Sequence, residues 1–161
     1  MLTHVQVADA PRRVPHPMPR QPSEPASGLV NSLGPIQHEW HILVLGKGGL
    51  DLMCGLLQAG APRVTHLCSH ERLEAGSASL VIVPQVSSLE WLETALPRIR
   101  RALITNGCLA VFVDPLPTTR NSVERMLKLH GLSTVRTKRV AGRLLLTAEV
   151  PDFGLRRCMR G

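Results

Sequence analysis

The sequence is poor in aromatic side chains, which make up 2% of its 161 residues and include no tyrosine. A hydrophobic core must therefore be built from aliphatic residues, within a chain that is 43% hydrophobic overall. Modules that bind nucleic acids by stacking bases on aromatic side chains are disfavoured by the same shortage. The composition thus argues against a nucleic-acid partner.

Paired cysteines and long apolar runs are also absent. The four cysteines show no C-x-x-C pair and no metal-ligand spacing, so the sequence predicts no bound metal. No apolar run reaches the ~20 residues needed to span a bilayer, and no hydrophobic signal segment opens the chain. We therefore expect a cytoplasmic protein with reduced cysteines and no membrane partner.

The net charge of +7 comes mostly from arginines, which are spread along the chain and form no dense block. This distribution favours a solvated, arginine-rich surface over a dedicated phosphate-binding patch.

Proline content divides the chain. Residues 1–40 hold seven of the thirteen prolines and predict a disordered Pro/Arg-rich arm, because proline blocks helices and removes backbone donors from sheets. Residues 41–151 carry the regular patterns of a folded domain, and residues 152–161 form a basic C-terminal tail.

The pattern within 41–151 alternates between short apolar runs and amphipathic stretches. Strands are predicted at 42–45, 64–69, 80–83 and 108–113, helices at 50–58, 89–103 and 120–130, and a hairpin at 133–140 and 143–150. Ser87 or Ser88 is expected to cap the second helix, and Pro97 to kink or break it. The order predicts an α/β, three-layer Rossmann-like sandwich: a mostly parallel sheet with a C-terminal antiparallel hairpin.

The first predicted strand ends in three glycines, Gly46, Gly48 and Gly49, and a helix follows. Such strand–glycine turn–helix units bind nucleotide-containing cofactors in doubly wound folds. Lys47 could meet a phosphate or carboxylate there, or remain solvated. The spacing differs from that of a P-loop and so disfavours nucleoside triphosphate hydrolysis.

The carboxyl ends of the third and fourth predicted strands carry further candidates, since ligands bind at this edge of parallel sheets. Pro84 and Gln85 follow the third strand; Gln85 could orient an acceptor or bond to backbone groups. Asp114 follows the fourth strand and could act as a general base or cap a turn. His66 lies within a predicted strand and is interpreted as a satisfied structural histidine.

Three segments resemble the class I S-adenosylmethionine-dependent methyltransferases, in particular those acting on small molecules: ILVLGKGG, the stretch from SASLVIVPQ to NGCLAVFV, and TVRTKRVAGRLLLTAEVP. They span about residues 41–151 in the family's order. The resemblance implies methyl transfer from S-adenosylmethionine to a small-molecule acceptor. It also implies cofactor binding by Gly46, Lys47, Gly48, Gly49, Glu71 and Pro84.

The chain departs from the family at its cofactor anchors. The family's acid before the loop is Val44 here, its last loop glycine is Leu50, and the acid that holds the ribose falls at about Cys68. Glu71 is the nearest substitute. Only about ten residues separate Ser69 from the third strand, too few for the family's usual helix–strand–helix, so one edge strand is expected to be missing.

Two alternatives follow from these departures. One is a non-catalytic, degenerate methyltransferase-fold scaffold or partner subunit; the other is a dinucleotide-binding Rossmann domain. The missing strand would leave the 64–69 strand open at one edge, which predicts self-association or a protein partner there. The enzymatic interpretation requires that the turn after Leu45 opens into a hollow that the protein's own side chains do not fill.

Overall fold

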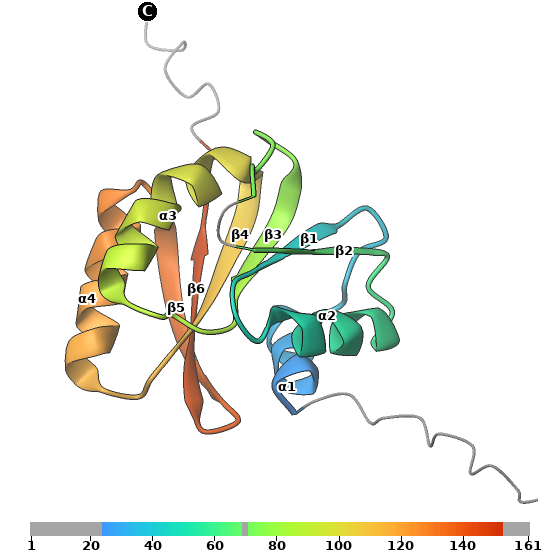
Figure 1. The fold of residues 1–161 in the computed structure, drawn as a ribbon, viewed down its shortest axis with the longest axis horizontal. Coiled ribbons are helices and arrows are strands. Elements are labelled where there is room, and N and C mark those ends of the chain that lie inside the picture. The colour runs from blue at the N-terminus through green and yellow to red at the C-terminus, as the bar shows by residue number, and fades with distance from the viewer. Residues whose placement is uncertain (1–23, 69–70, 153–161) are drawn as a thin grey trace, which may run out of the picture.

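The computed structural model describes residues 24–68 and 71–152, which form a six-stranded sheet with helices on both faces (Figure 1). Residues 1–23, 69–70 and 153–161 lie outside the described part, and with them most of the predicted arm and tail. The elements in chain order are α1 (Glu24–Leu33), β1 (His41–Leu45), α2 (Gly49–Gln58), β2 (Arg63–Leu67), β3 (Ala78–Val83), α3 (Leu89–Ala102), β4 (Leu103–Val113), α4 (Pro117–Leu129), β5 (Ser133–Val140) and β6 (Arg143–Glu149).

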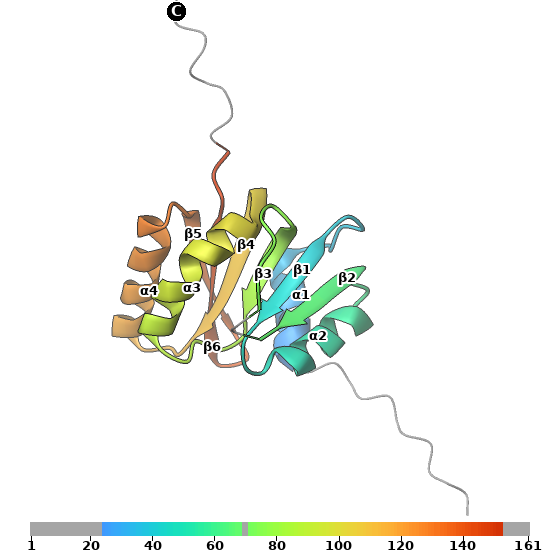
Figure 2. The ribbon, with the colours of Figure 1, turned by 45° about the horizontal axis from the view of Figure 1, so that its top comes forward.

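The strand order is β2-β1-β3-β4-β6-β5. The first four of these strands are mutually parallel, whereas β6 runs antiparallel to both β4 and β5. Helices α3 and α4 cover one face, and α1 and α2 cover the other (Figures 1 and 2). This arrangement confirms the predicted three-layer α/β fold with a C-terminal antiparallel hairpin.

The central strands are apolar throughout because both of their faces are buried. In β1, Leu43 and Leu45 pack toward α3 and α4, while Ile42 and Val44 pack toward α1 and α2. β3 and β4 alternate in the same way, as expected for strands whose side chains point to opposite faces in turn. Among the described residues, the core contains no buried polar side chain.

Helix α3 follows the predicted apolar stripe. Leu92, Leu96 and Ile99 are fully buried, and burial stabilises each by roughly 1.5–3 kcal/mol. Ser88 caps the helix, since its Oγ accepts a hydrogen bond from Trp91 N at 3.0 Å. The expected break at Pro97 does not occur, and one helix runs through this residue.

Helix α1 corrects the prediction that all of residues 1–40 form a disordered arm. Pro25 lies in the first turn, where the N–H that proline lacks would have no partner within the helix anyway. Leu29 is fully buried among residues of α2 and the sheet, and α1 also contacts β5. The folded unit therefore begins before residue 41. The proline content of residues 1–40 did not reveal the helix because Pro25 and Pro35 lie on either side of its apolar segment.

Two boundaries also differ from the prediction. β4 begins at Leu103 rather than at residue 108, and Asn106, which has a φ of 62°, lies at an irregularity within this strand. Helix α4 begins at Pro117 rather than near Arg120, because proline fits the first helical position.

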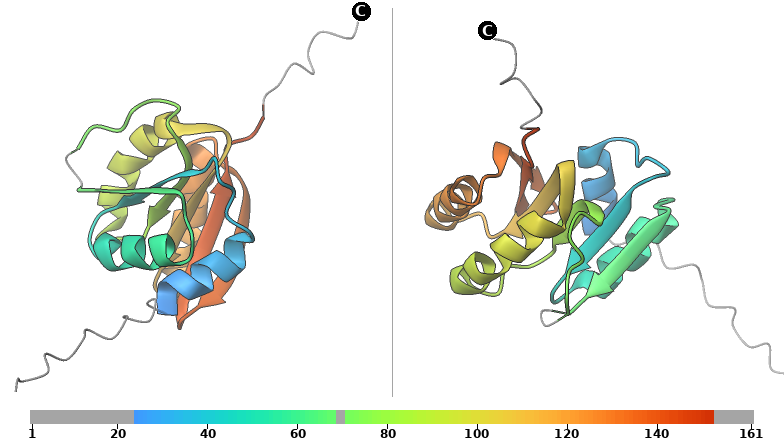
Figure 3. Two further views of the ribbon diagram at one scale, coloured as in Figure 1. Left: turned by 90° about the vertical axis from the view of Figure 1, so that its right-hand side faces the viewer. Right: turned by 90° about the horizontal axis from the view of Figure 1, so that it is seen from above.

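The expected loss of an edge strand is confirmed. β2 stands at the end of the sheet opposite β5 (Figure 3). Residues 68–77, called the connector here, lead from β2 to β3, and those that the structure describes form neither helix nor strand. The connector is tied to the end of α3, because Gly76 N and Ser77 N donate to the carbonyls of Arg101 and Ala102.

Candidate functional site

The glycine loop joins β1 to α2 as predicted. Gly46 and Gly48 have φ values of 87° and 74°, which residues with a Cβ rarely adopt. Gly46 N donates to Leu67 O at 3.1 Å, which fixes the loop to the end of β2. Gly48 precedes α2, and no side chain caps the first turn of this helix. The loop thus offers backbone N–H groups at a helix start, an arrangement that suits anionic or polar ligand atoms.

His66 supports the loop from beneath. Its Nε2 donates a hydrogen bond to Gly46 O at 3.0 Å. A Cβ on Gly49 would lie 2.4 Å from the His66 ring, so the ring fills the space beside this glycine. His66 is therefore a satisfied structural histidine that positions the loop, and Gly49 is required for packing.

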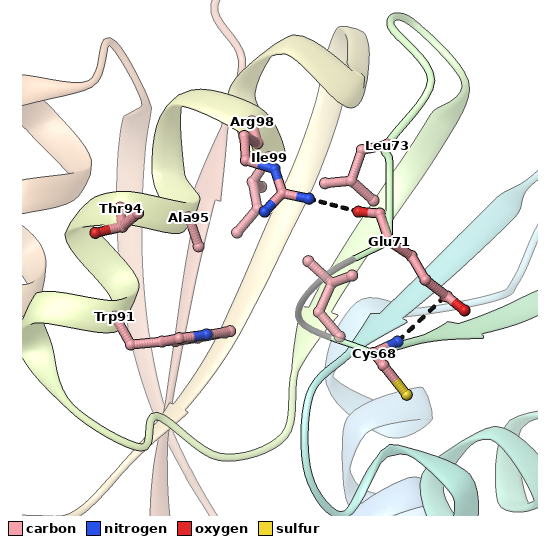
Figure 4. A pocket seen from close by; sticks show the side chains of 9 residues that line it. Cys68, Glu71, Leu73, Trp91, Thr94, Ala95, Arg98 and Ile99 are labelled. Carbon is pink, nitrogen blue, oxygen red and sulfur yellow. Dashed lines mark hydrogen bonds between the residues drawn. The ribbon is translucent and has the colours of Figure 1, made fainter.

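A cavity of about 250 Å³, called the connector cavity here, lies between the end of β1, the connector and α3 (Figure 4). The side of α3 contributes Trp91, whose ring lies about 3.9 Å from the position of a Cβ on Gly46. The cavity lies beside Leu45, and Trp91 forms part of its wall. Its lining residues are Leu45, Cys68, Glu71, Leu73, Trp91, Thr94, Ala95, Arg98 and Ile99.

Glu71 lies at the end of β2, beside the position where the resembling family has its acid. Its Oε2 accepts a hydrogen bond from Cys68 N at 3.2 Å, and its carbonyl accepts one from the Arg98 guanidinium (Figure 4). The carboxylate is solvent-exposed and borders the connector cavity. The connector therefore holds one carboxylate at this end of the sheet.

Two smaller cavities follow along the same edge. The loop cavity, of about 190 Å³, is lined by Lys47, Gly48, Asp51, Leu52, Pro84, Gln85, Phe112 and Arg143. The outer cavity, of about 160 Å³, is lined by Gln85, Val86, Ser88, Leu89, Phe112, Val113, Asp114, Thr119 and Arg143. Both lie where β3 and β4 end, and they share Gln85, Phe112 and Arg143.

The structure brings most of the predicted residues together in these cavities. Lys47 and Gly48 meet Pro84 and Gln85 in the loop cavity. Gln85 also meets Asp114 in the outer cavity. Glu71 shares no cavity with Asp114 and lies at the other end of the edge.

Sequence reasoning missed Arg143. Its Nη1 donates to Pro84 O at 2.7 Å, and the guanidinium carbon lies 5.6 Å from the centre of the Phe112 ring. The register places Val113 opposite Leu144, so the hairpin turn delivers Arg143 to the carboxyl end of β4. Its position directly after the predicted turn was the available signal, but only the strand order shows that this turn lies beside β4.

A fourth cavity, of about 440 Å³, lies between α1 and the strands β4, β5 and β6, and contains none of the predicted site residues. Cys108 lines it, and burial raises the pKa of this thiol to about 11, with a smaller contribution in the same direction from Glu149. Within residues 24–68 and 71–152, no group of three His, Cys, Asp or Glu side chains is placed to hold a metal ion. None of the helices in these ranges is long and apolar enough to cross a membrane.

No known protein-family model matches the chain, and neither does any curated protein sequence. Solved structures match its fold. The Burkholderia thailandensis 1,6-didemethyltoxoflavin-N1-methyltransferase, with bound 1,6-didemethyltoxoflavin and S-adenosylhomocysteine, is 17% identical with a TM-score of 0.57; the match covers 81% of this chain and 78% of that one. PigF with SAH is 16% identical with a TM-score of 0.53; this match covers 77% of the present chain and 54% of the PigF chain.

The T. thermophilus 16S rRNA N2 G1207 methyltransferase (RsmC), in complex with AdoMet and guanosine, is 15% identical with a TM-score of 0.57. That match covers 82% of this chain but 39% of the RsmC chain, so the protein spans well under half the length of this neighbour. These likenesses confirm a methyltransferase-like α/β fold that has diverged far in sequence.

Proposed function

We propose that this protein binds S-adenosylmethionine along the carboxyl edge of its sheet and transfers the methyl group to a small molecule. The observation that carries the proposal is the row of cavities that passes the glycine loop. Leu45, at the start of the loop, lines the connector cavity of about 250 Å³, and Lys47 and Gly48, within the loop, line the loop cavity of about 190 Å³.

The residues present fit the two ends of this cofactor. The connector cavity offers apolar side chains and the Trp91 ring to an adenosyl group, and Glu71 can accept hydrogen bonds from ribose hydroxyls. The loop cavity offers two cations, Lys47 and Arg143, and one anion, Asp51, to the amino-acid end, which carries one charge of each sign. Pro84 forms the wall between this cavity and β3.

The bound cofactor supplies an electrophilic methyl group, and the protein's task is to align an acceptor with it. Good alignment alone can reach effective molarities of about 10⁵ M or more. Gln85 lines both the loop cavity and the outer cavity and is therefore the residue proposed to orient the acceptor. Asp114 is proposed to take the proton of the acceptor, because it lies in the outer cavity and is exposed to solvent.

A non-catalytic scaffold is the alternative that a specific observation favours. Cys68 stands where the resembling family has an acid, and Glu71 already bonds to the backbone there. A dinucleotide-binding domain is the second alternative, and the same missing acid weakens it.

Titration calorimetry with S-adenosylhomocysteine and NAD, supported by thermal melting, separates the three. A ligand at 100 times its Kd adds about 2.7 kcal/mol of stability. Binding of S-adenosylhomocysteine supports the methyltransferase; binding of NAD alone supports the dinucleotide domain. Binding of neither ligand supports the scaffold.

We also propose that a second copy of the chain covers the β2 edge. In residues 24–68 and 71–152 no strand lies beside this edge, and the adjacent helix α2 exposes Leu50 and Leu57 to 58% and 46%, with Cys54 exposed between them. Antiparallel pairing of β2 with itself about Thr65 places Arg63 opposite Leu67 of the second copy, so the two arginines do not oppose each other.

Sedimentation of the full chain tests this proposal. A dimer is expected for the natural sequence and a monomer for Leu57→Glu, while Leu129→Glu, at a 75% exposed position on α4, serves as the matched control. A natural chain that remains monomeric contradicts the proposal.

A further inference from the structure

The Arg143 guanidinium is held in place at the boundary between the loop cavity and the outer cavity. One N–H bonds to the Pro84 carbonyl, and the group lies over the face of Phe112. Both of these partners belong to the protein interior, since Pro84 is buried and Phe112 is 2% exposed. The side chain is therefore preorganised rather than extended into solvent.

Most of the hydrogen-bonding capacity of this guanidinium is unused. Arginine carries five N–H donors, and the described residues accept one hydrogen bond from Arg143. No described carboxylate forms an ion pair with it, although Asp51 lines one adjoining cavity and Asp114 the other. A half-buried, fixed guanidinium with free donors matches a carboxylate, which it can bind through two parallel hydrogen bonds.

The outer cavity limits the kind of anion. Val86, Leu89 and Phe112 supply an apolar wall, which suits a hydrocarbon body attached to the charged group. Asp114 lines the same cavity and repels negative charge, so a group with one charge is favoured over a doubly charged phosphate. The volume of about 160 Å³ restricts the site to a small body.

We propose that Arg143 and the outer cavity form a subsite for a small monocarboxylate with an apolar body, and that the methyl acceptor belongs to this chemical class. The assignment of the ligand as acceptor rests on the proposed methyltransferase function. The anion subsite itself rests on Arg143, Pro84 and Phe112 and does not depend on that function.

The test uses the full chain labelled with ¹⁵N, with benzoate as the probe and benzamide as its neutral counterpart. The Arg143 Nε–H resonance, identified by its loss in Arg143→Lys, reports directly on the guanidinium. Benzoate is expected to shift this resonance saturably, whereas benzamide and inorganic phosphate leave it in place. Arg143→Gln should raise the benzoate Kd at least tenfold, and Arg139→Gln, which removes an exposed charge from the neighbouring strand β5, should leave it unchanged.

Equal shifts with benzoate and benzamide, or a larger shift with phosphate, would overturn the proposal. If Arg143→Gln does not fold, Arg143→Lys replaces it as the test variant. Lysine keeps the positive charge but cannot donate two parallel hydrogen bonds to a carboxylate, so the benzoate Kd should still rise several-fold. Titrations with and without S-adenosylhomocysteine separate the two proposals. If the protein binds benzoate but not S-adenosylhomocysteine, the carboxylate subsite is supported and the proposed methyltransferase function is contradicted. If it binds S-adenosylhomocysteine but not benzoate, only the subsite is contradicted.

Discussion

Replacement of Glu71 gives the sharpest test of cofactor binding. In the proposed complex its carboxylate accepts hydrogen bonds from two ribose hydroxyls, and each such charge-assisted bond contributes about 1.5–3 kcal/mol. The Glu71 side chain is exposed, so screening by solvent favours the lower figure. Two bonds then contribute about 3 kcal/mol, which corresponds to about a 100-fold change in Kd.

Two substitutions separate the contribution of the Glu71 charge to cofactor affinity from that of the whole side chain. Glu71→Ala removes the whole group and should raise the Kd for S-adenosylhomocysteine about 100-fold. Glu71→Gln keeps an oxygen that can accept from Cys68 N, so the connector stays in place while the charge is lost, and we expect roughly a tenfold increase. Glu74→Gln is the matched control, because Glu74 is an exposed residue of the same connector but does not line the cavity.

Isothermal titration calorimetry measures these affinities, and urea denaturation checks that each variant is as stable as the natural chain. An unchanged Kd in Glu71→Ala, measured on a natural chain that does bind S-adenosylhomocysteine, removes Glu71 from the cofactor site.

Three further predictions concern stability, each read from chemical denaturation. Gly49→Ala should lower the free energy of unfolding by about 1–3 kcal/mol, since its Cβ would lie 2.4 Å from the His66 ring. Adding His66→Ala should recover part of this loss; if the effects of the two substitutions on the free energy of unfolding simply add, the prediction is contradicted. Ser88→Ala should cost about 1 kcal/mol through loss of the cap on Trp91 N, whereas Ser87→Ala should cost little; equal effects would argue against the cap. Burial raises the pKa of Cys108 to about 11 in the folded chain, so the unfolded chain releases this proton first, and stability should fall as pH rises from about 9 to 11; Cys108→Ala should remove that component of the pH dependence.

The central sheet could be predicted from the sequence because a strand that is buried on both faces consists of consecutive apolar residues. Ile42 through Leu45 are apolar without interruption, and each belongs to one of the two cores. The missing edge strand followed from the short distance between β2 and β3, a matter of chain length alone. Both features are local, and local patterns are readable in a single sequence.

The site was predicted less completely, because it depends on which strand lies beside which. Gly46 and Pro84 directly follow their own strands and could be named as candidates from the sequence, whereas Arg143 reaches the same edge only because β6 pairs with β4. Trp91 lies within a helix that the sequence predicts, but only the structure shows that this residue lines a cavity. Helix α1 was missed for a different reason, since proline frequency over 40 residues concealed an apolar segment between Pro25 and Pro35.

The position of β6 also bears on how the chain is made. β6 comes after β4 and β5 in the chain and is the last strand of the described residues, yet it lies between these two strands. A nascent polypeptide that ends before Arg143 has nothing to join β5 to the growing sheet, so the edges of β4 and β5 both stay open until translation of β6 is complete. Exposed strand edges in partly made chains favour aggregation. Slow decoding of residues 143–149 should therefore reduce the yield of native protein more than equal slowing within α2.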